Sequence, residues 1–265
     1  MDKTIGFIGS GALASAMIGG IVKSGSPKAQ KVMASDCSVE KLKQLEEMYA
    51  IQTTTDNQVV ARFADILFLT VKPNLYAEVI AQIRDDVKQD GIIVTPALGQ
   101  TLANVRRLFG KDMKILRTMP NTPALVGEAM SALSPNEWIS AGEMQELQAI
   151  FESFGKAEII SESLMDIVPG VSGSSPAYVF MFIEAMADAA VSEGMPRSQA
   201  YQFSAQAVLG AAKMVLETNL HPGQLKDQVC SPNGSTIAAI CELERTGFRH
   251  AVISAVKACT QKART

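Results

Sequence analysis

The start of the chain constrains its fold most, because an apolar run leads directly into a glycine-rich turn. The run is Thr4-Ile5-Gly6-Phe7-Ile8 and the turn continues as Gly9-Ser10-Gly11-Ala12-Leu13-Ala14. Small residues at such a turn let the backbone approach a pyrophosphate, and the following helix directs its free N–H groups at the anion. The pattern therefore predicts a dinucleotide-binding strand, turn and helix; a tight turn that binds nothing is the alternative.

Composition indicates a globular protein that acts on small molecules. The 265 residues are 47% hydrophobic and 19% charged, which leaves room for two modest domains. A formal net charge of −3 with only two histidines argues against a nucleic-acid surface. The most apolar stretch, residues 178–191, is interrupted by Glu184 and Asp188, so we expect a buried helix and no membrane partner.

The cysteines predict neither a disulfide framework nor a metal site. They form no CxxC pair and have no metal-like spacing with a histidine; they are Cys37, Cys230, Cys241 and Cys259. The chain begins without the apolar core of a secretory signal. We therefore expect reduced thiols and a cytoplasmic location.

Residues 1–161 alternate short β-rich runs with helical stretches, a pattern typical of a parallel sheet covered on both faces. Apolar residues recur at helical spacing over residues 39–49, and we also expect a helix over residues 75–88. We predict a Rossmann-type, doubly wound α/β domain over 1–161. Its expected strands are Thr4–Ile8, Lys31–Ser35, Asp65–Thr70, Gly91–Thr95, Lys114–Thr118, Ala129–Ala132 and Ala157–Ile160.

Residues 162–265 contain only helical segments and predict a second, all-α domain. In the segments 177–191 and 201–215, apolar residues and alanines occupy more than one face of the expected helix. Each helix must therefore pack against neighbours on several sides. A domain of this size keeps much of its surface exposed, which favours a homodimer built on these helices. A compact monomeric bundle is the alternative.

Three further segments have the composition of a binding site. Residues 69–73 place Lys72 after a strand, at the edge where open α/β sheets bind ligands; a solvated lysine is the alternative. Residues 119–123 form a stiff polar loop at the same edge, or an ordinary turn. Residues 231–236 open a helix whose free N–H groups suit a small carboxylate, or form a well-capped helix start.

Five motifs in order resemble the pyrroline-5-carboxylate reductases of proline biosynthesis. They are Val71-Lys72-Pro73, Met119-Pro120-Asn121-Thr122-Pro123, the segment Val171–Phe180 with its Ser172-Gly173-Ser174-Ser175-Pro176 core, His221–Asp227 and Ser231–Thr236. The resemblance covers the whole chain. It implies NADPH- or NADH-dependent reduction of the cyclic imine 1-pyrroline-5-carboxylate to L-proline.

The resemblance also implies the residues of the site. The expected cofactor contacts are Ile8, Gly9, Ser10, Gly11, Ala12, Leu13, Asn57, Thr70, Val71, Lys72, Pro73, Ala97 and Leu98. The expected substrate contacts are Ser174, Asn233, Gly234, Ser235 and Thr236. Family enzymes are dimers with interlocking helical domains, and dimers often assemble into rings.

An imine changes what the catalytic site must supply. A protonated imine is already electrophilic, so orientation and a hydroxyl near the nitrogen replace the general acid/base of an alcohol dehydrogenase. We assign Thr236 to the ring nitrogen and the N–H groups of Gly234 and Ser235 to the carboxylate. The alternative for Thr236 is a local backbone hydrogen bond in the first helical turn.

Cofactor choice is open between NADPH, which we favour, and NADH. Asp36 follows the second strand, where an acid would bind the ribose diol and repel a 2′-phosphate. Ser35 and Asn57 are the expected contacts of that phosphate. Ser175, Asn233, Pro96 and Leu98 depart from the usual family residues.

Two other functions remain as alternatives. A β-hydroxyacid dehydrogenase shares the glycine turn and helical domain, but its lysine is missing, since residues 173–210 contain none. A non-catalytic redox sensor would bind the dinucleotide without oxidising it and would not need the helix start at 231–236.

Overall fold

The computed structural model describes residues 2–25 and 27–264 and divides into two compact units. The first runs to Gly173 and includes the chain from Cys259 onward; the second is Ser174–Ala258. The expected boundary after residue 161 therefore lies inside the first unit. Residues 162–173 remain with the sheet because Arg117 forms ion pairs with Glu162 at 3.2 Å and Asp166 at 2.8 Å.

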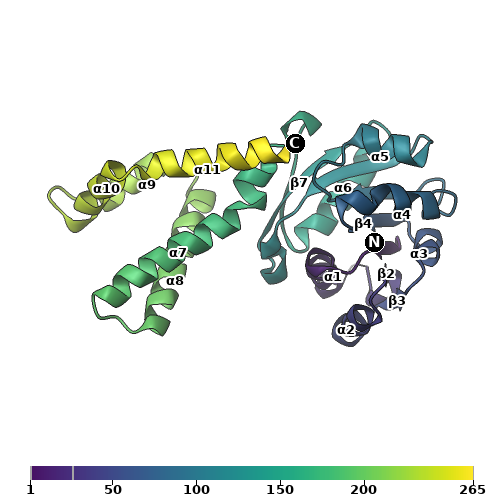
Figure 1. Cartoon of the computed structure of the whole chain (residues 1–265), viewed down its shortest axis with the longest axis horizontal. Coiled ribbons are helices and arrows are strands. Elements are labelled where there is room, and N and C mark those ends of the chain that lie inside the picture. Colours follow the sequence, from purple (N-terminus) through teal and green to yellow (C-terminus); the bar gives the residue numbers. More distant parts are fainter. Residues whose placement is uncertain (1, 26, 265) are drawn as a thin grey trace. The chain divides into compact units, whose positions relative to one another are not determined.

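The first unit is built on an eight-stranded sheet with the order β3-β2-β1-β4-β5-β6-β7-β8 (Figure 1). The strands are β1 (Ile5–Ile8), β2 (Val32–Ser35), β3 (Gln52–Thr54), β4 (Ile66–Leu69), β5 (Ile92–Thr95), β6 (Lys114–Met119), β7 (Ala129–Pro135) and β8 (Gly155–Ile159). The strand order reverses direction at β1, beside β4, as in a doubly wound fold. This confirms the predicted Rossmann-type architecture and places the expected ligand crevice at the carboxyl ends of β1 and β4.

Two features of the sheet differ from the sequence prediction. The edge strand β3 is a short polar segment, Gln-Thr-Thr, and has no apolar alternation that would reveal it. Strand β7 runs antiparallel to β6, so the sheet is mixed. Only the short η3 turn (Thr122–Val126) joins these two strands, and a parallel pair needs a crossover of a dozen or more residues.

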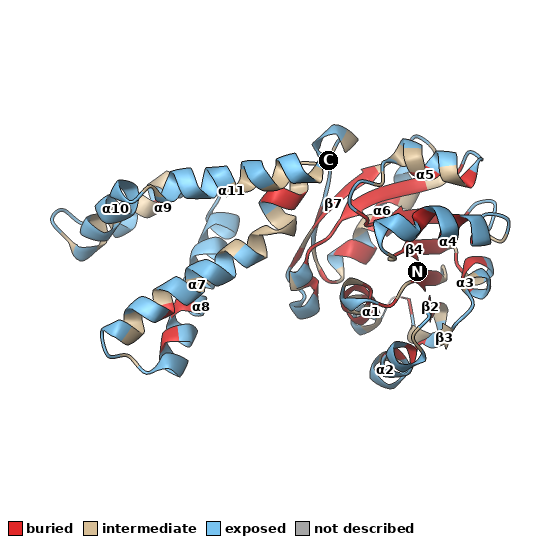
Figure 2. Ribbon diagram, in the orientation of Figure 1, coloured by how far each residue is buried: buried red, intermediate tan, exposed pale blue. Residues whose placement is uncertain are grey.

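Helices cover both faces of the sheet and bury its apolar side chains (Figure 2). One face packs against α1 (Ala12–Ser24), α2 (Val39–Tyr49) and α6 (Ala141–Glu152). The other packs against α3 (Asn57–Phe63), α4 (Tyr76–Ile83) and α5 (Leu102–Phe109). Helix α4 is shorter than the expected 75–88 and follows the η2 turn (Pro73–Leu75). The strand ends are thereby held rigidly at one edge.

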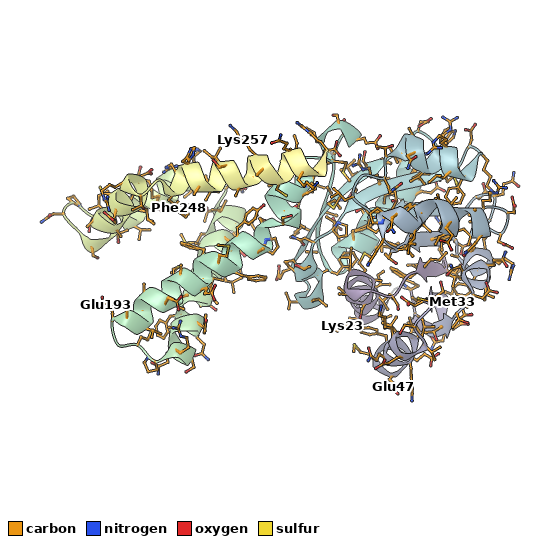
Figure 3. All side chains as sticks on the ribbon, in the orientation of Figure 1. Lys23, Met33, Glu47, Glu193, Phe248 and Lys257 are labelled. Carbon is orange, nitrogen blue, oxygen red and sulfur yellow. The ribbon has the colours of Figure 1, made fainter. Side chains whose placement is uncertain are left out.

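From residue 162 to 264 the described chain is helical, without a strand. The helices are α7 (Ser175–Ser192), α8 (Arg197–Thr218), α9 (Pro222–Val229), α10 (Ser235–Arg245) and α11 (Phe248–Ala263). Helices α7 and α8 pack side by side (Figure 1). The ring centroid of Phe182 in α7 lies 6.0 Å from that of Phe248 in α11, the residue that Figure 3 labels. None of the helices in the described ranges is long and apolar enough to cross a bilayer.

Large apolar side chains remain exposed over this helical unit, which Figure 2 shows as mostly pale blue. Met181 is 70% exposed, Phe203 67% and Leu216 76%, whereas Ala187 and Ala200 are buried between helices. A single copy therefore buries Ala187 and Ala200 and leaves several large apolar residues of α7 and α8 uncovered. Contiguous exposed apolar surface marks an interaction site.

Candidate functional site

The glycine turn is held between strands β2 and β4. Gly9 has φ +98°, and a Cβ at this position would lie 2.8 Å from the carbonyl oxygen of Thr70. The Gly9 N–H donates to the Ser35 carbonyl at 2.8 Å, and the Thr70 hydroxyl lies 3.0 Å from the Ile8 carbonyl and 2.7 Å from that of Gly9. Only glycine fits here, because both the backbone angle and the space exclude a side chain.

Gly11 serves a different purpose from Gly9. It is the N-cap of α1 with φ −66°, and a Cβ built there would meet nothing within 4 Å. The helix start also has no side-chain cap. The first N–H groups of α1 therefore face open space that a phosphate can enter, which fits a dinucleotide pyrophosphate.

A cleft of about 510 Å³ lies at this point of the sheet, and we call it the switch-point cleft. Eight of the expected cofactor residues line it: Ile8, Gly9, Gly11, Asp36, Asn57, Thr70, Val71 and Lys72. Sequence reasoning missed six others, namely Cys37, Lys41, Leu75, Glu78, Val79 and Gln82. Four of these, Leu75, Glu78, Val79 and Gln82, share one face from η2 into α4, at i, i+3, i+4 and i+7. Two of them are polar, so no apolar periodicity marks this face in the sequence.

The remaining expected cofactor residues lie around the cleft without lining it. Ser10 and Ala12 border an adjoining hollow of about 300 Å³, together with Gly11 and Lys41. Leu13 packs against the core, and Ser35 is buried, with its hydroxyl donating to Asn57 Oδ1 at 2.8 Å. Further along the edge, Pro73 begins η2, Ala97 is buried and Leu98 is exposed.

The carboxylate of Asp36 is already fully engaged by the protein. Its Oδ2 accepts from the N–H and hydroxyl of Ser10, both at 2.8 Å, and its Oδ1 accepts from the N–H of Ser38 at 2.9 Å. Partial burial opposes ionisation, but these hydrogen bonds outweigh it and lower the pKa of Asp36. Asp36 therefore fastens the glycine turn to the end of β2, instead of presenting free oxygens to a ribose.

Two lysines, Lys41 and Lys72, line the switch-point cleft, and Lys41 is the one that interacts with Asp36. It lines both the cleft and the adjoining hollow, and its charge contributes to the low pKa of Asp36. Within residues 2–25 and 27–264, no carboxylate forms an ion pair with it. Lys41 also sits in the first turn of α2, where a positive charge opposes the helix dipole. That unfavourable placement is the sequence signal that could have identified it.

The polar loop at 119–123 does not form part of the switch-point cleft. Asn121 is buried, its Oδ1 accepts from the N–H of Met130 at 2.9 Å, and its Nδ2 donates to the Ser172 carbonyl at 2.9 Å. None of the residues 119–123 is among those that line the switch-point cleft. Asn121 instead fastens the start of β7 to the segment that precedes α7.

Comparisons with known proteins agree along the whole chain. A family model described as pyrroline-5-carboxylate reductase dimerisation matches residues 162–265, and one described as NADP oxidoreductase, coenzyme F420-dependent, matches residues 4–99. The pyrroline-5-carboxylate reductase of Escherichia coli K12 is 49% identical over 262 residues, covering 99% of this chain and 97% of the relative. That of Methanosarcina acetivorans is 40% identical over 263 residues, with 99% and 97% covered.

The chain belongs to the pyrroline-5-carboxylate reductase family. A solved reductase from Coxiella burnetii superposes with a TM-score of 0.92 at 32% identity, covering 100% of this chain and 98% of the other. The Plasmodium falciparum reductase, solved with NADP bound, gives 0.90 at 29% identity, with 99% and 97% covered. Fold and family assignment therefore rest on independent sequence and structural similarity.

The reductase motif at residues 231–236 forms the start of α10. Gly234 is its N-cap, without a side-chain hydrogen bond, and Asn233 adopts the left-handed conformation with φ +59°. Within the described part of the chain, the Thr236 hydroxyl has no hydrogen-bond partner, so the local backbone bond considered for it is not made. Ser174, the other expected substrate contact, is the N-cap of α7.

Across residues 2–25 and 27–264, no three His, Cys, Asp or Glu side chains gather where they could hold a metal ion. Cys37, Cys230, Cys241 and Cys259 form no disulfide.

Proposed function

We propose that this chain reduces 1-pyrroline-5-carboxylate to L-proline with NADPH as the hydride donor. The observation that carries the proposal is full-length similarity to enzymes of that name, at 49% identity for the Escherichia coli relative. The switch-point cleft supports it with a glycine turn suited to a dinucleotide. These relatives favour imine reduction over a β-hydroxyacid dehydrogenase or a redox sensor.

The dinucleotide would lie with its pyrophosphate at Gly11 and the first N–H groups of α1. NADPH is preferred over NADH because Asp36 is committed to Ser10 and Ser38, whereas Lys41 has no carboxylate partner among the described residues. A 2′-phosphate would meet Lys41, with Ser35 and Asn57 nearby on the same side. Charge-assisted contacts of this kind strengthen binding of the phosphate.

The start of α10 would hold the substrate. The N–H groups of Gly234 and Ser235 suit its carboxylate, Ser174 and Asn233 add polar contacts, and the Thr236 hydroxyl would bond the ring nitrogen. A bound NADPH supplies the hydride that the imine carbon receives. The protein's contribution is orientation, since the protonated imine needs no general base to become electrophilic.

We also propose a homodimer formed through the helical unit, with dimers able to assemble into a ring, and a cytoplasmic location. The dimerisation model over residues 162–265 and the exposed apolar side chains of α7 and α8 support the dimer. Four cysteines that form no disulfide suit a reducing compartment. Sizing in solution tests the assembly: a monomer at micromolar concentration would contradict it.

Steady-state oxidation of NADPH by the purified full chain tests the activity. The proposal expects turnover with 1-pyrroline-5-carboxylate, a higher kcat/KM for NADPH than for NADH, and no turnover of β-hydroxy acids with the oxidised cofactor. Binding of NADPH without its oxidation would favour the sensor. Turnover of a hydroxy acid would favour the dehydrogenase.

A further inference from the structure

One buried hydroxyl joins the ends of two strands below the switch-point cleft. Tyr76, the first residue of α4, is 1% exposed. Its hydroxyl donates to the Leu69 carbonyl at 2.6 Å and lies 2.9 Å from the Thr95 hydroxyl. Leu69 ends β4 and Thr95 ends β5, so one oxygen joins the ends of two neighbouring strands.

The directions of these two hydrogen bonds follow from the phenol's single proton. That proton goes to the Leu69 carbonyl, so the Thr95 hydroxyl donates to the Tyr76 oxygen. Burial raises the pKa of Tyr76 and outweighs the opposing bond from Thr95. The phenol accordingly remains neutral and keeps its donor.

The bonded segments are those that face the cofactor. The bond to Leu69 closes the loop of residues 70–75, which supplies Thr70, Val71, Lys72 and Leu75 to the switch-point cleft. Thr70 in turn supports the glycine turn through its bonds to the Ile8 and Gly9 carbonyls. On the far side, the Gln100 side chain donates to the Pro73 carbonyl at 3.3 Å, which joins the same loop to the segment after β5.

We propose that Tyr76 is a positioning residue that holds the loop 70–75 and the segment 97–100 in one fixed arrangement for the dinucleotide. The proposal rests on the proposed function, because it needs a dinucleotide in the switch-point cleft. Tyr76 acts through Leu69 and Thr95 and contacts no cofactor itself. A phenylalanine would fill the same buried space without joining the strand ends, so the hydroxyl alone carries the role.

The test deletes the hydroxyl of Tyr76 and the hydroxyl of Thr95 separately and together. Tyr76→Phe and Thr95→Val each break the bond, Thr95→Ser retains it, and Tyr49→Phe removes a hydroxyl from a tyrosine packed against α1 on the other face of the sheet. NADPH affinity is measured by fluorescence titration, apo stability by thermal unfolding, and KM for both substrates by steady-state kinetics. The double variant Tyr76→Phe/Thr95→Val completes a cycle.

Tyr76→Phe and Thr95→Val should each raise the Kd for NADPH about tenfold, a loss of about 1.4 kcal/mol. The double variant should lose little more than either single variant, because both break the same link. Thr95→Ser and Tyr49→Phe should bind NADPH like the wild type, and KM for the imine should not move.

Wild-type affinity in both hydroxyl-deleted variants, with only a lower apo Tm, would overturn the proposal and leave Tyr76 a stability element. Additive losses of affinity in the double variant would likewise exclude a shared link. If the wild-type chain itself bound no NADPH, the proposed function would fail instead, so the two failures are distinguishable.

Discussion

Substituting Gly11 with alanine separates the cofactor role of the glycine turn from its role in folding. The added Cβ meets no protein atom within 4 Å, and φ −66° suits any residue. Alanine reduces the entropy of the unfolded chain, worth about 0.4–1 kcal/mol, and is a poorer N-cap by a similar amount. These effects offset each other, so Tm without cofactor should stay within about 2 °C of wild type.

Cofactor binding should respond quite differently to Gly11→Ala. We propose that the pyrophosphate occupies the open space at Gly11, beside the N-terminus of α1. The methyl group of the new alanine would therefore contact the pyrophosphate. Overpacking of a close contact costs about 1–3 kcal/mol. That cost corresponds to a Kd for NADPH about 5- to 150-fold higher.

Gly9→Ala is the matched comparison. Its left-handed backbone costs alanine about 1–2 kcal/mol, and the Thr70 carbonyl 2.8 Å from the new Cβ must also move. We expect a Tm lower by about 5–15 °C, from a total of about 2–5 kcal/mol.

Fluorescence titration with NADPH and thermal unfolding of the apo protein measure both effects. Wild-type NADPH affinity in Gly11→Ala would refute the placement of the pyrophosphate. A large fall in the apo Tm of that variant would refute the claim that Gly11 is free of packing.

Three further predictions concern charge and orientation. Lys41→Met should lower the ratio of kcat/KM for NADPH to kcat/KM for NADH by about tenfold or more, because it removes a charge-assisted bond to the 2′-phosphate. The control is Lys43→Met, which removes an exposed lysine paired with Glu47 on the same helix and should not change that ratio. Thr236→Ala should lower kcat/KM for the imine about ten- to hundredfold with unchanged NADPH affinity, and an unaltered kcat/KM would remove Thr236 from the mechanism. Partial burial of Glu143 opposes ionisation, but hydrogen bonds from Lys114 and from the helix N-cap lower the pKa of Glu143 to about 2. Because the pKa of Glu143 is lower in the folded than in the unfolded state, ionised Glu143 stabilises the protein above about pH 4.5, and this contribution is lost as the pH falls towards about 2. The difference in Tm between the wild type and Glu143→Gln should therefore narrow over that pH interval. A difference that stays constant would contradict the assignment.

The architecture could be predicted because its signals are local. The glycine turn between an apolar run and a helix identifies a strand and its ligand edge, and repeated buried strands are uniformly apolar. Strand β3 lacked any signal, since Gln52–Thr54 gains its pairing from β2 and not from its own pattern. The antiparallel direction of β7 could have been predicted, because only residues 119–128 separate the two expected strands, fewer than a parallel crossover needs.

The site was only partly predictable, because hydrogen-bond partners are set by tertiary structure. Asp36 looked like a ribose ligand from its place after β2, yet its oxygens are bound by Ser10 and Ser38. Asn121 had the composition of a pocket residue, and the fold uses it to join β7 to residue 172. Tyr76 attracts no attention in the sequence because its role arises from strand ends that meet only after folding.

The most direct measurement follows the hydride itself. NADPH carrying deuterium on the transferred position of nicotinamide C4 is incubated with the full chain and 1-pyrroline-5-carboxylate, and the proline is analysed by mass spectrometry. Direct hydride transfer predicts one deuterium in the product, at the ring carbon that was the imine carbon. Proline without deuterium, or no proline at all, would contradict the assigned reaction.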